Sequence, residues 1–323
     1  MVSINLDKYS KNELYMLQEL VKVSIANCIK LECYVKKIEE TFVCPDCSST
    51  NTVKNGKSPQ GIQKYKCKDC GKTRVMTRNT LMFSSKKKFH QWSVFIESMF
   101  AQDSIIVSMV KADISKNTAF RWRIKILNIL STLINQDKLG DLVYLDDTYI
   151  NKVQKNSNVP HVITTKRGTS NDKICVACAI DKNNNTIIKV ADIGRVSSKA
   201  LINVFKDKIK EQSKVVADSH RSYHKLMKAL NVDWKKIPSK KKSIDEYDLE
   251  LINHLHAQIK DFLYYYKGVS LKYLQGYLSL FEMKRIHKRF YQSDTFEKIL
   301  HLTFKACGHI RCTDIDNGEI IIV

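Results

Sequence analysis

The stretch Leu142-Val-Tyr-Leu-Asp146-Asp147-Thr-Tyr149 ends a short apolar run on two adjacent carboxylates. A second stretch, Val215-Val-Ala-Asp218-Ser-His220, ends in the same way 72 residues later (218 − 146). Short apolar runs that lead into polar residues are typical of buried strands. Runs at residues 174–180 and 186–193 flank an Asn-rich turn and predict a hairpin. Helical patterns at residues 199–210 and 249–266 complete the expectation of a mixed α/β domain.

Asp146 and Asp218 are candidate metal ligands in this domain. Two carboxylates on neighbouring strands can hold a pair of Mg²⁺ ions about 3.5–4 Å apart. Such ions activate a nucleophile and stabilise the leaving oxygen of a phosphodiester. The alternative is that each aspartate is an ordinary surface or turn residue, and the carboxylates alone do not decide between the two.

Upstream of the strands, two Cys-x-x-Cys pairs lie 19 residues apart. The two turns, Cys44-Pro-Asp-Cys47 and Cys67-Lys-Asp-Cys70, match the spacing of a structural zinc site, in which four thiolates close a tetrahedron around Zn²⁺. A redox dithiol is the less favoured alternative. The spacing therefore predicts a zinc ribbon over residues 41–80.

The remaining cysteines are not expected to bind metal together. Cys175 and Cys178 are three apart in a predicted strand and should face opposite sides of it. Cys28 and Cys33 follow an apolar helical pattern and are expected in a core. Cys307, His309 and Cys312 lack an evident fourth ligand.

The chain is strongly basic. Its 323 residues include 54 Lys+Arg against 33 Asp+Glu, a net charge of +21, and a hydrophobic content of 43% that excludes disorder throughout. Residues 54–88 carry eleven Lys or Arg and one acid, Asp69, which points to a polyanionic partner. A solvated basic surface is the alternative. The predicted DNA contacts of the ribbon are Lys64, Lys66, Lys72 and Arg74.

Membrane insertion and secretion are not expected. The longest apolar stretch, at residues 174–180, is far shorter than the roughly 20 residues that span a bilayer. The first residues lack the apolar core of a signal peptide. Ten cysteines in such a chain favour reduced thiols, and we expect a cytoplasmic, nucleoid-associated protein.

Residues 103–127 predict a second DNA-binding element, a helix-turn-helix within the region 85–130. Asp113-Ile-Ser115 would form the turn, with Ser115 as the N-cap of a helix over residues 116–127. A plain helical hairpin is the alternative. The recognition helix would present Lys116, Arg121 and Arg123 to DNA.

Five motifs in this order resemble one family of bacterial insertion-sequence transposases, numbered fifteen-ninety-five and also called ISXO-two-like. After the ribbon and the helix pair come Asp146-Asp-Thr-Tyr149, Asp218-Ser-His-Arg-Ser-Tyr223-His-Lys-Leu226 and His256-Ala-Gln258-Ile-Lys260-Asp-Phe262. Arg167-Gly168 and Lys267-Gly-Val-Ser-Leu-Lys-Tyr-Leu274 match as well. The resemblance covers about residues 40–285.

The resemblance implies a ribonuclease-H-like catalytic domain that cuts element ends with Mg²⁺ or Mn²⁺ and joins them to target DNA. It makes Asp146 and Asp218 the first two acids of a DDE-type triad and places Gln258 at the third position, where many members carry Glu. A neutral carbonyl oxygen binds a hard cation more weakly than a carboxylate does. Glu250 and Asp261 are substitute third ligands, and a functional third ligand could also be absent.

On the predicted helix, Gln258 can face the acids while Ile259 packs beneath it. Lys260 is about 200° further around and is expected to contact a phosphate instead.

The whole pattern predicts a multidomain protein. Its expected parts are a helical segment (1–40), the zinc ribbon (41–80), the helix-turn-helix region (85–130), a ribonuclease-H-like domain with a mixed sheet (138–305) and a tail (306–323). The expected function is a DNA transposase that acts on double-stranded DNA as a homodimer or higher oligomer. Two alternatives are a catalytically inactive, transposase-derived DNA-binding regulator and a nuclease without strand transfer.

Overall fold

The computed structural model describes most of the chain between the zinc ribbon and residue 289. The described residues are 42–59, 61–78, 80–83, 85–134, 138–152, 172–238, 243–244 and 246–289, together with Ser10, Lys11, Leu14, Tyr15 and Gln18. The expectations for residues 1–40 other than these five, and for Cys307, His309 and Cys312, lie outside them. The described residues fold as two compact units: the first ends at Phe120 and the second begins at Arg121.

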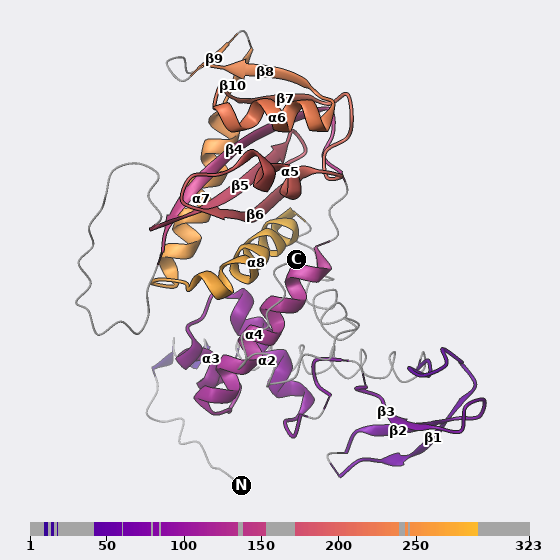
Figure 1. Cartoon of the computed structure of the whole chain (residues 1–323). Coiled ribbons are helices and arrows are strands. Elements are labelled where there is room, and N and C mark those ends of the chain that lie inside the picture. The colour runs from indigo at the N-terminus through magenta and orange to yellow at the C-terminus, as the bar shows by residue number, and fades with distance from the viewer. Residues whose placement is uncertain are drawn as a thin grey trace. The chain divides into compact units, whose positions relative to one another are not determined.

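The first unit contains a three-stranded antiparallel sheet formed by β1 (Thr52–Lys57), β2 (Gln63–Cys67) and β3 (Thr73–Val75) (Figure 1). Thr52 pairs with Cys67, so the end of β2 lies at the start of β1. This sheet has a very small core, in which the ring of Tyr65 is buried and stacks on Phe42. Because so little apolar surface is buried, the ribbon depends on another stabilising element.

Three helices follow the ribbon: α2 (Phe89–Phe100), α3 (Ile105–Lys111) and α4 (Lys116–Leu133). The predicted cap is confirmed, because Ser115 Oγ accepts a hydrogen bond from the Thr118 amide at 3.3 Å. The turn between α3 and α4 is fixed from α2, since Gln91 Nε2 donates to the carbonyls of Ala112 and Asp113. The division between the two units falls inside α4.

The second unit is built on a five-stranded mixed sheet with the order β6-β5-β4-β7-β8. β4 pairs antiparallel with β5 and parallel with β7, and β5–β6 is antiparallel while β7–β8 is parallel. The expected mixed sheet is confirmed. The strands are β4 (Leu142–Asn151), β5 (Lys173–Asp181), β6 (Thr186–Ile193), β7 (Lys214–Asp218) and β8 (Asp233–Ile237).

Helices cover both faces of this sheet. One face forms the main core against α5 (Ser198–Phe205) and α6 (Arg221–Leu230), where Leu201, Phe205 and Tyr223 are fully buried. On the other face, α7 (Glu250–Tyr265) packs on β4 and β5, and α8 (Leu271–Arg289) packs on β6. A two-stranded hairpin of β9 (Ser243–Ile244) and β10 (Tyr247–Asp248) precedes α7.

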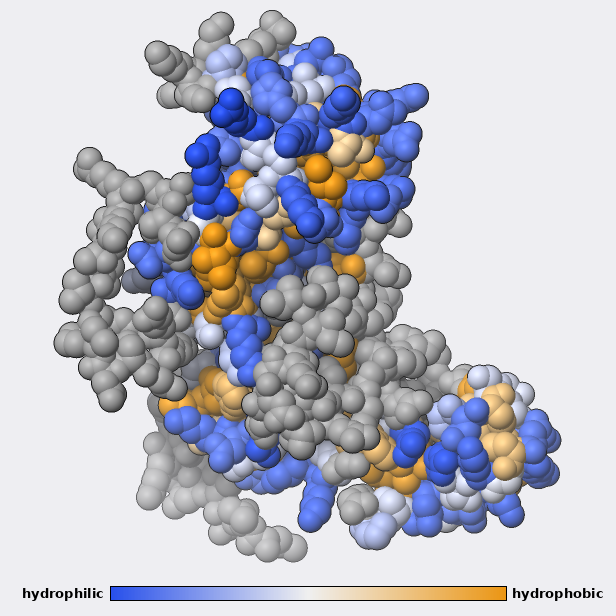
Figure 2. Space-filling model, viewed as in Figure 1, coloured by the Kyte–Doolittle hydropathy of each residue, from blue (hydrophilic) through white to orange (hydrophobic). Residues whose placement is uncertain are grey.

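The visible surface of the described residues is mainly hydrophilic, with smaller apolar patches (Figure 2). Within the part of the chain that the structure describes, no helix is long and apolar enough to cross a membrane.

Candidate active site and zinc centre

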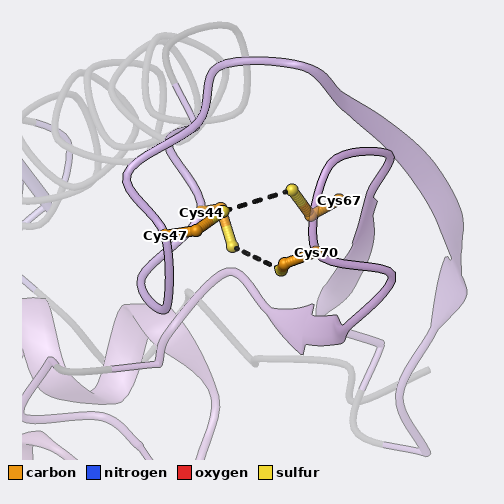
Figure 3. Close-up of side chains that lie close together, drawn as sticks. All are labelled: Cys44, Cys47, Cys67 and Cys70. Atoms are coloured by element: carbon orange, nitrogen blue, oxygen red, sulfur yellow. Dashed lines mark hydrogen bonds between the residues drawn. The ribbon is translucent and has the colours of Figure 1, made fainter.

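Four cysteine side chains converge in the ribbon (Figure 3). The sulfur atoms of Cys44, Cys47, Cys67 and Cys70 all lie within 4.8 Å of one another. Cys44 Sγ is 3.7 Å from Cys70 Sγ, and Cys47 Sγ is 3.6 Å from Cys67 Sγ. The predicted ligand set is therefore assembled, and four such sulfurs fit a structural Zn²⁺ with no open coordination position.

Backbone amides prepare these thiols for metal binding. The amide of Cys70 points at Cys67 and lowers the pKa of its thiol to about 7, with a further contribution from the Asp69 amide. The pKa of Cys44 is also lowered, chiefly by the amide of Asp46. Burial and the neighbouring thiols instead raise the pKa values of Cys47 and Cys70. Because the thiolate is the form that binds zinc, the first cysteine of each Cys-x-x-Cys turn is the one favoured as thiolate before the ion binds.

An acidic side chain next to the zinc ligands holds two basic side chains. Asp46, inside the first Cys-x-x-Cys turn, accepts hydrogen bonds from Arg74 Nε at 2.8 Å and Arg74 Nη2 at 3.1 Å, and from Lys72 Nζ at 3.3 Å. Arg74 therefore connects β3 to the first Cys-x-x-Cys turn. Its expected DNA contact would compete with this bidentate ion pair.

The other predicted DNA contacts differ in exposure. Lys66, Lys116 and Arg121 are exposed, and Lys64 is half-buried. Arg123 is only 3% exposed and hydrogen-bonds Tyr277 of α8, so the prediction that it contacts DNA is wrong. The packing there is close, because a Cβ atom on Gly276 would lie 2.8 Å from Leu127 Cβ.

The second cluster lies on the central strands of the mixed sheet. Leu145 of β4 pairs with Ala217 of β7, so the next residues, Asp146 and Asp218, lie side by side at the end of this parallel pair. Both face the α7 side of the sheet, because they alternate with Leu145 and Ala217, which lie in the core on the opposite face. The structure thus brings together the two acids that the sequence singles out.

Both carboxyl groups of this cluster have raised pKa values. Burial, followed by the neighbouring charges of Asp147 and Asp218, raises the pKa of Asp146 to about 7. Burial also raises the pKa of Asp218. A divalent cation between two such carboxylates would offset both effects, so the donor set fits Mg²⁺ or Mn²⁺.

Three polar side chains of α7, His256, Lys260 and Gln258, differ in their contacts with these acids. His256 is buried, with Nδ1 3.9 Å from Asp146 Oδ2. Burial and the charge of Lys260 lower the pKa of His256 to about 4, so the ring is neutral and the contact is not an ion pair. Lys260 also lowers the pKa of Asp146, which places its ammonium in the field of the cluster. Gln258 Oε1 instead accepts a hydrogen bond from Arg285 Nη1 of α8.

The sequence does not single out His256 beside this cluster or Asp147 behind it. His256 is one turn before Lys260 and shares a helix stripe with it. Asp147, which faces the opposite side from Asp146, receives a hydrogen bond from Tyr223. A signal for Asp147 was available in the sequence, because it is a second carboxylate inside a predicted buried strand.

Two family models match the chain. Residues 138–285 match the ISXO2-like transposase domain, and residues 41–71 match the InsA N-terminal domain, a zinc ribbon. The first match contains Asp146, Asp218 and all of α7, and the second contains all four zinc ligands. No curated protein matches the chain.

Several solved structures are distantly similar. The cryo-EM structure of the simian T-cell lymphotropic virus intasome with a PP2A regulatory subunit is 9% identical over 59% of this chain and 68% of that chain, with a TM-score of 0.30. The crystal structure of the Mos1 strand transfer complex is 11% identical over 68% of this chain and 79% of that chain, with a TM-score of 0.25. The Drosophila P element transposase strand transfer complex is 12% identical over 66% and 62%, with a TM-score of 0.27.

The two domain matches lie in the order that the motifs predict and contain the two residue clusters that the structure assembles. The chain is therefore similar to the ISXO2-like transposase domain over residues 138–285 and to a zinc ribbon of the InsA type over residues 41–71.

Proposed function

We propose that this protein is a transposase that cuts the ends of its own insertion sequence and joins them to target DNA with Mg²⁺ or Mn²⁺. The observation that carries the proposal is the juxtaposition of Asp146 and Asp218 where the parallel pairing of the central strands β4 and β7 ends. The strand order β6-β5-β4-β7-β8, with antiparallel β6–β5 and β5–β4 pairings and parallel β4–β7 and β7–β8 pairings, supports a ribonuclease-H-like assignment for the domain.

In this proposal, the carboxylates of Asp146 and Asp218 hold the cations. Bound ions of this kind activate the attacking oxygen and stabilise the leaving oxygen of a phosphodiester. Water first attacks the phosphorus at the element end and releases a 3′-hydroxyl, which then attacks a phosphodiester of the target. Lys260 supplies a positive charge to the phosphate beside the acids.

The third ligand is expected from α7. The family resemblance makes Gln258 the candidate, and its amide would have to leave Arg285 to reach a cation. Asp261 and Glu250 are exposed on the same helix, and each is an alternative candidate for the third ligand.

The zinc ribbon and the α3–α4 helix pair are proposed to hold double-stranded DNA as a helix-turn-helix protein does. Lys66, Lys116 and Arg121 are exposed, as phosphate or base contacts must be. Lys64, Lys72 and Arg74 belong to the same proposed surface. Recombination of two element ends needs two copies of the active site, so we propose that a homodimer or higher oligomer acts.

Cleavage of a duplex that carries the terminal repeat flanking the gene tests the proposal directly. With Mg²⁺ or Mn²⁺, the protein should release the 3′-end and join it to a second duplex. Asp146→Asn should abolish both products and leave DNA binding intact. Asp233→Asn is a matched control, because Asp233 is exposed at the start of β8.

A second candidate is a DNA-binding regulator without catalysis. It is favoured by one observation, namely that the α7 side chains beside Asp146 are a neutral imidazole and an ammonium rather than a carboxylate. Equal inertness of the wild type and Asp146→Asn, with both binding the terminal repeat, would establish the regulator and exclude the transposase activity proposed above.

A further inference from the structure

Helix α6 exposes a row of basic side chains and no acid. Apart from Ala229, its exposed residues are Arg221, His224, Lys225 and Lys228. Arg221, Lys225 and Lys228 are spaced four and three residues apart, so they lie on one side of the helix. Among the described residues, none of these three cations has a hydrogen-bond or ion-pair partner, whereas other lysines of the chain, such as Lys72, are paired with aspartates.

This arrangement costs helix stability. Like charges four or three residues apart repel each other, and the cation of Arg221 is in the first turn, where the positive end of the helix dipole disfavours it. A surface that serves only solubility interleaves both signs of charge. The row on α6 is therefore better explained by an anionic partner, which neutralises the repulsion when it binds.

The basic surface continues from α6 onto strand β8. The ring of His224 lies edge-on against Trp234 with 4.9 Å between the ring centroids, and Lys236 Nζ lies 4.5 Å from the ring centroid of the same indole. Trp234 and Lys236 therefore face α6, as alternate residues of one strand face the same side. We call this surface the α6 patch and define it as Arg221, His224, Lys225, Lys228, Trp234 and Lys236. In the view shared by Figures 1 and 2, hydrophilic residues gather around α6 and β8.

The α6 patch begins beside the proposed metal site. Arg221 follows Asp218 by three residues, and Lys236 pairs with Ala217, the residue before Asp218. From Arg221 to Lys228 the row extends about 10 Å along the helix, at about 1.5 Å per residue. Each strand of a DNA duplex carries a phosphate about every 3.4 Å along the axis, so the length of the row matches a run of about three phosphates.

We propose that the α6 patch binds the phosphate backbone of the target duplex and holds it beside Asp146 and Asp218. The inference rests on the proposed function, in which a cut element end is joined to a target. Lysine and arginine contacts to phosphates carry no sequence information, which suits a duplex that differs from one insertion to the next. The ribbon and the α3–α4 pair, by contrast, are proposed to bind the terminal repeat.

DNA binding by the full-length, zinc-loaded protein tests the patch without any reaction. The triple variant Lys225→Gln, Lys228→Gln and Lys236→Gln should weaken binding to a duplex that lacks the terminal repeat. Each phosphate contact contributes about 0.9 to the slope of log affinity against log salt, so this slope should fall by up to about 2.7. Affinity for a duplex that carries the terminal repeat should fall less. Fluorescence anisotropy across a salt series measures both quantities on both duplexes.

The joining reaction gives a second readout. In the triple variant, joining of a pre-cut element end to a limiting amount of target duplex should fall with the affinity for that duplex. Release of the 3′-end should be unchanged, because the patch does not hold the element end. A higher concentration of target should restore joining.

Matched variants separate the patch from total charge and from folding. Lys138→Gln, Lys182→Gln and Lys210→Gln remove the same charge from exposed positions near the start of β4, at the other end of the sheet, and should keep the wild-type slope. Lys225→Arg, Lys228→Arg and Lys236→Arg keep the charge of the patch and should keep the binding. If the triple glutamine variant does not fold, the double variant Lys225→Gln and Lys228→Gln should still lower the slope by up to about 1.8.

The inference and the proposed function fail in different ways. An unchanged slope in the folded patch variant, an equal fall in the charge-matched control, or a larger loss of affinity for the terminal repeat than for the other duplex overturns the inference. If the wild type joins DNA and the patch variant joins it equally well at limiting target, only the inference is overturned. If the wild type neither cuts nor joins with Mg²⁺ or Mn²⁺ while the patch variant still loses duplex binding, the proposed transposase activity fails and the α6 patch remains a DNA-binding surface.

Discussion

The hydroxyl of Tyr223 donates a hydrogen bond of 2.8 Å to Asp147 Oδ1 on the main-core side of the sheet. Tyr223 is in the first turn of α6, five residues after Asp218, and Asp147 follows Asp146 in β4. Asp147 Oδ2 also lies 3.7 Å from Cys175 Sγ of β5. The bond therefore connects the two segments that carry the metal-binding candidates, from the face opposite to them.

Removing this phenol should weaken both the fold and the metal site. Tyr223→Phe leaves a half-buried carboxylate with one donor fewer, so the free energy of unfolding should fall by about 1–3 kcal/mol. Mn²⁺ affinity should fall as well, because the spacing of Asp146 and Asp218 is less fixed. Urea denaturation and Mn²⁺ titration measure the two effects. Tyr247→Phe, which loses only a contact with Lys214, should leave Mn²⁺ affinity unchanged.

The zinc site should be needed for the ribbon and dispensable for the mixed sheet. Metal analysis of the wild type should give one Zn²⁺ per chain, and Cys67→Ser should abolish it. Because the three ribbon strands have a very small core, losing the ion should unfold them and remove DNA binding. Cys178→Ala changes a buried cysteine of β5 and should keep full zinc content. Zinc loss in this control, or a zinc-free Cys67→Ser that still binds DNA, would contradict the assignment.

Much of the fold could be predicted because it depends on local patterns. The expected run at 186–193 matches β6, and the cysteine spacing alone identified four converging ligands. The helix expected over 199–210 ends earlier, at Phe205, since Asp207 adopts a left-handed φ of 64° that no helix continues through. Strand β8 was missed, because only Ile237 at its end is buried and the rest of Asp-Trp-Lys-Lys-Ile has the polar pattern of an edge strand.

The site was harder to predict than the fold. Helix periodicity shows which residues share one side of a helix, but it does not show which side faces the sheet. Gln258 and His256 both lie on polar positions of α7, and only tertiary packing decides which one faces Asp146. Arg123 shows the same limit. Its charge suggested a DNA contact, but α4 continues into the second unit, where Tyr277 binds the guanidinium in a buried place.

A buried acid on α8 should make stability depend on pH. Burial raises the pKa of Glu282 from 4.5 to about 8, while the charge of Lys189 opposes the rise. The folded state therefore keeps a proton that the unfolded chain loses near pH 4.5. This contribution to stability is fully present below pH 4.5 and is lost as the pH rises through about 8.

Glu282→Gln keeps the shape of the side chain and removes the titration. Its free energy of unfolding should fall less than that of the wild type between pH 5 and 8, as measured by urea denaturation at each pH. Glu211→Gln changes an exposed acid of the same unit and should follow the wild-type curve. Parallel curves for the wild type and Glu282→Gln would show that Glu282 is ionised in the folded protein.

Two arginines on α4 should separate DNA contact from packing. Arg121 is exposed, whereas Arg123 is 3% exposed and bonded to Tyr277. Each phosphate contact contributes about 0.9 to the slope of log affinity against log salt, so Arg121→Ala should weaken binding to the terminal repeat and reduce that slope by about 1.

Arg123→Met should instead lower the free energy of unfolding by about 1–3 kcal/mol, because it removes a buried hydrogen bond, and leave the salt slope unchanged. Fluorescence anisotropy across a salt series and urea denaturation measure both quantities on both variants. The reverse assignment of effects would contradict the placement of the two side chains.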